Sequence, residues 1–158
     1  VQWRGPQRTG HVPESWPVPA KLPAEPKVVW RIKTGESYAS PVISAGKVFY
    51  SDNVGGKETL HAVDAATGKE FWSAAIDDVH TDTQGPPAPR CTPLVDGERV
   101  YGQSCKGELQ CLNVADGKLV WHVNYPQDLG AVFIGEKGNA PGAARHGSRR
   151  RLRGLSRA

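Results

Sequence analysis

Apolar and polar residues alternate over short runs between about residues 40 and 124, and turns containing glycine separate the runs. In the first half of this region, the alternation predicts strands over 41–43, 47–51, 59–64 and 70–74. Ala45-Gly46 and Asp96-Gly97 suit tight hairpin turns, because glycine reaches positive φ without a steric clash. Such strands need a second layer to cover their apolar faces. We therefore predict an all-β fold.

The same pattern occurs twice along the chain. The front halves of the two copies align with an offset of 52 residues, from Ser40 to Thr92, and the back halves with an offset of 49, from Gly68 to Gly117. Hairpin loops absorb length changes at small thermodynamic cost. We therefore place the difference in the hairpin at 52–58 of the first copy and 104–108 of the second.

The tryptophans give the period of the repeat. Trp30 and Trp72 are 42 residues apart, and Trp72 and Trp121 are 49 apart. A propeller blade of four short strands takes about 40–50 residues. We therefore predict a partial β-propeller of about two to three four-stranded antiparallel blades, with repeats at about 38–75 and 90–124.

Two segments, 62–72 and 111–121, resemble the tryptophan-docking motif A-x-D-x-x-T-G-x-x-x-W of the pyrroloquinoline quinone (PQQ) repeat family. The first segment matches every defined position, whereas the second has Cys111, Asn113 and Asp116 in place of Ala, Asp and Thr. The resemblance implies that each tryptophan packs between adjacent blades and that local hydrogen bonds hold the turn before it. The implied blade-docking residues are Trp30, Asp64, Thr67, Gly68, Trp72, Gly117 and Trp121.

The chain divides into three parts by composition. Residues 1–27 are rich in proline, which predicts an extended arm, and 28–138 carry the blade pattern. Residues 139–158 hold six arginines and no acidic residue, which indicates a basic tail that is disordered or an aberrant end. These arginines outnumber the net charge of +4, so the rest of the chain is net negative.

Two or three blades cannot close a ring, since closed propellers need about four to eight. The chain is therefore expected to be a truncated piece of a longer protein. The opening residues Trp3-Arg4-Gly5-Pro6 and the run 26–35, in which Trp30 would close a partial blade, resemble the start of secreted bacterial propellers of the PQQ-like family. That resemblance implies a periplasmic or extracellular location.

The composition of the chain bears on whether it binds membranes or nucleic acid. No apolar run approaches about 18 residues, so we predict no membrane span. A basic tail is able to bind nucleic acid or an anionic surface. An unstructured end explains the same residues, and we expect no nucleic-acid partner. The absence of an initial methionine and of a charged-then-apolar leader fits a mature chain without its signal peptide or a trimmed one.

The three cysteines, Cys91, Cys105 and Cys111, leave one thiol over in any pairing. Metal binding favours close spacing with a second ligand pair, which is absent, so we expect no metal site in the chain. A Cys105–Cys111 disulfide and simple packing of Cys111, in place of the motif's alanine, both remain open. The adjacent cysteine pair of many quinoprotein alcohol dehydrogenases is absent.

A PQQ dehydrogenase requires cationic groups for the quinone carboxylates, a carboxylate base and usually Ca²⁺. Residues at the start of the inner strands are the ones to examine: Tyr38, Ser40, Arg90 and Thr92. Arg90 is the candidate cofactor-binding residue, because a guanidinium matches a carboxylate bidentately. The alternative is that Arg90 braces a neighbouring blade. His80 and Asp82 suggest a metal or a base, or else a solvated connection between blades. We assign no catalytic residue.

The sequence contains no recognisable hydrolase or nucleotide-binding motif, which leaves two candidate functions. The first is a non-catalytic binding or assembly platform, like the propeller lipoprotein of the outer-membrane insertion machinery. Its partners would be the remaining blades or another protein. The second is part of a periplasmic PQQ-dependent dehydrogenase that oxidises alcohols or sugars with PQQ and Ca²⁺. The sequence favours the first for this chain, because no calcium-ligand group is recognisable.

Overall fold

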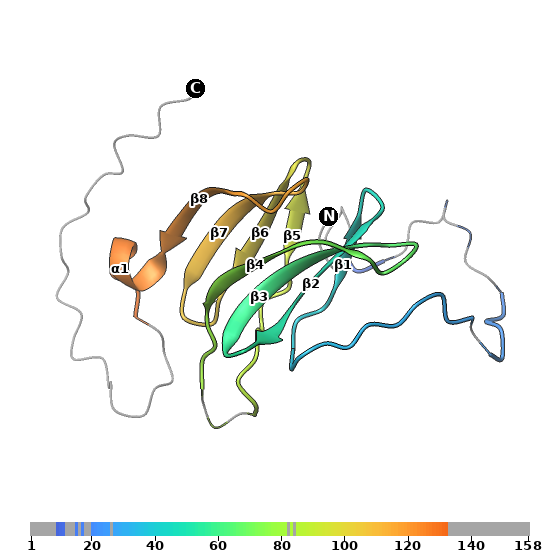
Figure 1. The fold of residues 1–158 in the computed structure, drawn as a ribbon, viewed down its shortest axis with the longest axis horizontal. Coiled ribbons are helices and arrows are strands. Elements are labelled where there is room, and N and C mark those ends of the chain that lie inside the picture. The colour runs from blue at the N-terminus through green and yellow to red at the C-terminus, as the bar shows by residue number, and fades with distance from the viewer. Residues whose placement is uncertain are drawn as a thin grey trace.

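The computed structural model describes residues 9–11, 15, 17, 20–25, 27–81, 83 and 85–132, which form two four-stranded antiparallel sheets (Figure 1). In each sheet the strands pair in chain order. The first sheet contains β1 (Val42–Ser44), β2 (Lys47–Val54), β3 (Lys57–Asp64) and β4 (Glu70–Asp78). The second contains β5 (Leu94–Asp96), β6 (Arg99–Gln103), β7 (Glu108–Asn113) and β8 (Leu119–Asn124).

This architecture confirms the predicted all-β partial propeller. Each sheet is one blade, and the strands cover both expected repeats. Residues 27–41, which include Trp30, form no strand, so the described part of the chain contains two blades and not three.

The loop predicted at 52–58 is wrong in extent. Strands β2 and β3 stay paired as far as Val54 and Lys57, and the turn is only Gly55-Gly56. Both glycines have positive φ, 59° and 87°, which lets a two-residue turn close this hairpin. In the second blade, strands β6 and β7 are shorter and residues 104–107 separate them. The length difference between the copies therefore does lie in this hairpin.

Smaller differences concern strand ends and turns. Strand β4 continues past residue 74 to Asp78, because its partner β3 begins early enough to pair with it at Lys57. The second blade's first turn consists of residues 97–98, because Asp96 is the last residue of β5 and pairs with Arg99. These shifts follow the cross-strand register, which local composition does not specify.

The core lies between the two sheets. Strand β4 lies against β7, and β1 lies beside β5. Phe49, Leu60 and Ala62 are fully buried in this interface. Side chains from both sheets form the cluster: Val42, Phe49, Leu60, Ala62, Trp72 and Ile76 from the first and Val95, Val100 and Leu112 from the second. Each sheet therefore buries its apolar face against the next one.

A short helix, α1 (Tyr125–Leu129), follows β8 and was not predicted. The Asn124 side chain accepts a hydrogen bond from the Gln127 backbone N–H, and Gly130 ends the helix in the left-handed region with φ 66°. Asparagine before proline in the first turn and glycine after the last are known helix signals. The sequence therefore contained the signal for this helix.

The predicted arm and tail are largely beyond what can be described. Within residues 1–27, those described form no helix or strand, and most are exposed. The tail at 139–158 and the end of the blade region after residue 132 lie outside the described residues. No helix in the described part of the chain is long and apolar enough to cross a membrane.

Leu60→Ala is expected to lower the free energy of unfolding by about 2–5 kcal/mol, because it leaves a cavity between the sheets. Leu119→Ala is the control, since that side chain is 53% exposed, and it should cost no more than about 0.5 kcal/mol. Urea unfolding followed by circular dichroism measures both. Equal losses in the two variants would contradict a core placed between the sheets.

Candidate functional site

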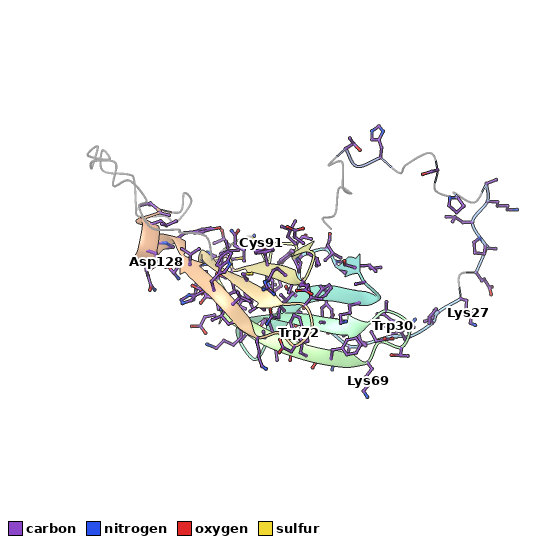
Figure 2. The ribbon with its side chains drawn as sticks, turned by 90° about the horizontal axis from the view of Figure 1, so that it is seen from above. Lys27, Trp30, Lys69, Trp72, Cys91 and Asp128 are labelled. Atoms are coloured by element: carbon purple, nitrogen blue, oxygen red, sulfur yellow. The ribbon has the colours of Figure 1, made fainter. Side chains whose placement is uncertain are left out.

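Two tryptophans each contact the β-turn of the following blade. The Trp30 indole N–H donates to the Ala65 carbonyl at 2.9 Å, and the Trp72 indole N–H donates to the Val114 carbonyl at 3.0 Å. Ala65 and Val114 occupy equivalent places, directly after β3 and β7. Figure 2 shows Trp30 beside the turn that carries Lys69, and Trp72 further inside the molecule. The same contact therefore occurs twice, one repeat apart.

A glycine lies under each indole. A Cβ atom on Gly68 would lie 2.8 Å from the Trp30 ring, and one on Gly117 would lie 2.6 Å from the Trp72 ring. Both glycines also have positive φ, 72° and 70°. Close approach and backbone conformation thus both require glycine at these two positions.

The turn under Trp30 is held by Asp64. Its Oδ1 atom accepts from the backbone N–H of Ala66 at 3.0 Å, and from the backbone N–H and the hydroxyl of Thr67, each at 2.8 Å. These hydrogen bonds, chiefly that from the Thr67 hydroxyl, hold the pKa of Asp64 below its ordinary value of 3.8. The turn is therefore held by its own hydrogen bonds as well as by its contact with the indole.

The turn under Trp72 keeps the backbone shape with different side chains. The Gly117 N–H donates to the Asn113 carbonyl at 2.9 Å, as the Gly68 N–H does to the Asp64 carbonyl at 2.8 Å. Asp116 accepts from the Lys118 N–H at 3.1 Å, and the Asn113 side chain accepts from the Arg99 guanidinium. The departures from the motif thus leave the tryptophan contact intact.

Trp121 is the third indole of the series, and it is exposed. It packs against Tyr101 with ring centroids 5.9 Å apart, as Trp72 packs against Phe49 at 6.1 Å. Trp121 is 44% exposed, however, compared with 9% for Trp72. Among the described residues, no turn accepts a hydrogen bond from its indole. In the described part of the chain, nothing covers this side of the second blade.

The structure brings together the four polar residues at the start of the inner strands. The Arg90 guanidinium lies 5.1 Å from the centre of the Tyr38 ring, and the Tyr38 N–H donates to the Pro89 carbonyl at 2.9 Å. The Ser40 N–H donates to the Thr92 hydroxyl at 3.1 Å. This cluster joins the segment before β1 to the segment before β5. Asp82, predicted with His80, lies outside the described residues.

These residues do not assemble a calcium-dependent quinone site by themselves. Ca²⁺ takes six to eight oxygen ligands, yet no three His, Cys, Asp or Glu side chains in the described ranges gather as metal ligands. Arg90 offers one cation near one hydroxyl-bearing ring. The donor set for PQQ with Ca²⁺ is therefore incomplete in this part of the chain.

A polar network across the first blade, buried at Asp52 and His61 and half exposed at Glu70, was missed at the sequence level. His61 on β3 lies between two carboxylates: its Nε2 is 2.9 Å from Asp52 on β2, and its Nδ1 is 2.7 Å from Glu70 on β4. Asp52 also accepts from the Gly35 N–H at 2.8 Å, and Tyr50 stacks on the His61 ring. These hydrogen bonds join strands β2, β3 and β4 to the segment before β1. The alternation of Tyr50 and Asp52 on one face was its only sequence signal.

Two sheets stacked face to face, with a tryptophan of one docked on a glycine turn of the next, define a segment of a β-propeller built from tryptophan-bearing repeats. The family model described as outer membrane protein assembly factor BamB matches residues 21–144. That match covers most of the chain, which therefore belongs to this family of PQQ-like repeat proteins. No curated protein sequence matches the chain.

Solved structures of two kinds are similar to it. The crystal structure of BamB from Moraxella catarrhalis is 19% identical, with a TM-score of 0.43, over 56% of this chain and 24% of that chain. The quinohemoprotein alcohol dehydrogenase from Comamonas testosteroni is 25% identical, with a TM-score of 0.45, over 60% of this chain and 14% of that chain. The chain thus spans a quarter or less of either protein.

Gly117→Ala is expected to destabilise the protein more than Gly97→Ala. Both positions have positive φ, 70° and 55°, which costs alanine about 1–2 kcal/mol. Only at Gly117 would the new Cβ also meet an indole, which adds about 1–3 kcal/mol of overpacking. Urea unfolding followed by tryptophan fluorescence measures both variants. A similar cost at the two positions would mean that Trp72 does not press on the turn.

Thr67→Val is expected to raise the pKa of Asp64 towards 3.8, because it removes the hydroxyl that contributes most to lowering it. A lowered pKa stabilises the fold above about pH 4, and this contribution is lost as the pH falls through the folded-state value. Thr67→Val should therefore weaken the loss of stability in acid, while Thr67→Ser should not. An NMR titration of the Asp64 carboxyl checks this, and an unchanged pKa in Thr67→Val would refute it.

Proposed function

We propose that this chain is a non-catalytic propeller segment that serves as a binding or assembly platform, and that it works in the periplasm or outside the cell. The exposed indole of Trp121 is the observation that carries the proposal. The match to a family described as an outer-membrane assembly factor supports the same class of function and the same location.

The two internal contacts define what Trp121 would bind. Trp30 and Trp72 each take a backbone carbonyl for the indole N–H and a glycine under the ring. An indole offers a large apolar surface with one polar edge, so its burial is favourable only where that N–H finds an acceptor. The partner of Trp121 is therefore a glycine turn of the kind found at 64–68 and 113–117, on a further PQQ-like blade or on a protein that presents the same turn.

A second candidate function is a portion of a PQQ-dependent dehydrogenase that oxidises alcohols or sugars. The cluster of Tyr38 and Arg90 favours it, because a guanidinium beside the inner strands is suited to a quinone carboxylate. When bound, PQQ would supply the oxidising power for the substrate, and Arg90 would hold and orient it. The rest of that site would have to come from other blades.

Photo-crosslinking at position 121 tests the platform function. The substitution Trp121→p-benzoylphenylalanine, in the protein expressed in its own host cells, should crosslink to a peptide that contains a glycine turn of a PQQ-like repeat. The same substitution at Leu129, which is 59% exposed on α1, is the control. Crosslinking at position 121 that does not exceed the control would contradict the proposal.

Calorimetric titration of the full-length protein that contains this chain with PQQ and Ca²⁺ separates the two functions, because the rest of a cofactor site would come from its other blades. The platform function predicts no saturable binding to that protein. Saturable binding that Arg90→Ala abolishes and Arg90→Lys weakens less would instead favour the dehydrogenase, because lysine keeps the charge but not the bidentate geometry.

A further inference from the structure

At the end of the blades opposite the tryptophan turns, Cys105 contacts the segment that leads into Cys91. Cys105 lies in the turn between β6 and β7, and Cys91 lies in the connection just before β5. The Cys105 sulfur is 3.7 Å from the Ala88 carbonyl, and the backbone N–H of Arg90 also donates to it. The residue next to Arg90 in the chain is Cys91. Both thiols are free and partly exposed.

Cys111 belongs to a different environment. It is buried in the middle of β7, opposite Tyr101 and Trp121 in the register. Three residues of extended strand separate it from Glu108, which amounts to about 10 Å. Disulfides need Cα atoms within about 7 Å of one another. Cys105 lies in the turn that precedes Glu108, at the end of β7 away from Cys111, so the Cys105–Cys111 pairing that the sequence left open is disfavoured by the fold.

A buried carboxylate lies beside the pair. Glu58 is 2% exposed, and both of its oxygens accept from the Cys105 backbone N–H, at 3.1 and 3.3 Å. Burial, and then the charge of Glu58, raise the pKa of both thiols, that of Cys105 to about 12. The Cys91 thiolate also contributes, as the smallest of these causes, to the raised pKa of Cys105.

We propose that Cys91 and Cys105 are a modification site, at which an intramolecular disulfide forms by exchange with an external disulfide. One thiol loses its proton and attacks the external disulfide RSSR, which forms a mixed disulfide and releases one RSH. The second thiol then attacks the protein sulfur of that mixed disulfide, which releases the second RSH. The two cysteines are oxidised by two electrons in total, and RSSR is reduced to two RSH.

The bridge would link the connection before β5, which carries Cys91, to the turn between β6 and β7, which carries Cys105. The same turn is already held on the first blade, because the Ser104 hydroxyl donates to Asp77 on β4 at 2.8 Å and the Cys105 N–H donates to Glu58 on β3. A covalent link restricts the unfolded chain and so stabilises the fold. Since the thiols are largely protonated at neutral pH, closure should become faster as the pH rises.

Tryptic mapping after oxidation tests the pairing. Cleavage at Arg90, Arg99, Lys106 and Lys118 places the three cysteines in separate peptides, 91–99, 100–106 and 107–118. The folded full chain is incubated with oxidised glutathione, its remaining thiols are alkylated, and it is digested without reductant. We expect peptide 91–99 linked to peptide 100–106, with Cys111 alkylated after unfolding. A link between 100–106 and 107–118, or no link between any two of the peptides, would overturn the proposal.

Matched variants show whether the bridge is specific to the fold. Cys111→Ser should still form the linked pair, and oxidation should raise its urea midpoint, whereas Cys91→Ser should show no rise. The same oxidation in concentrated urea should scramble the pairings of the wild-type chain. If native and unfolded protein give the same mixture of links, or if oxidation leaves the midpoint of Cys111→Ser unchanged, the proposal fails.

Discussion

The packing of an indole from one blade on a glycine turn of the next is the contact on which this structure depends. The ring fills the space above Gly68 or Gly117, and its N–H pairs with a backbone carbonyl at the same turn. An apolar surface alone would let two sheets slide against each other, because hydrophobic burial is not directional. The hydrogen bond and the close approach to glycine fix the position of one sheet on the other.

The same contact recurs from one blade to the next. The glycine turn of each blade packs on the tryptophan that precedes it in the series. Each blade is therefore stabilised by its contacts with its neighbours, as in other repeat proteins. Trp30 gives the segment before β1 the same role as a blade, although that segment forms no strand. Trp121 is the third tryptophan of the series, on the other side of the second blade. Its exposed ring is the observation on which the proposed function is based.

The opposite end of the blades is joined by different chemistry. There, polar groups link the two sheets: Ser104 donates to Asp77, and the Cys105 N–H donates to Glu58. Glu58 is a buried carboxylate whose pKa is raised. A buried charge is costly unless donors satisfy it, and the backbone N–H of Cys105 is the donor here. The indole end thus sets the geometry of the sheets, while at the opposite end burial, and then the charge of Glu58, raise the pKa of the Cys91 and Cys105 thiols.

The sequence by itself determined the strands, the two repeats and the hairpin that absorbs their length difference, because strand periodicity, turn glycines and the spacing of Trp30, Trp72 and Trp121 are local properties of the chain. It also contained the signals for α1, which were overlooked. Only the tertiary structure decided which carbonyl each indole meets, that Trp121 stays exposed, that Arg90 lies over Tyr38, and that His61 lies between Asp52 and Glu70. Those contacts depend on strand register and on how one sheet docks on the next, and residues far apart in the chain specify both together.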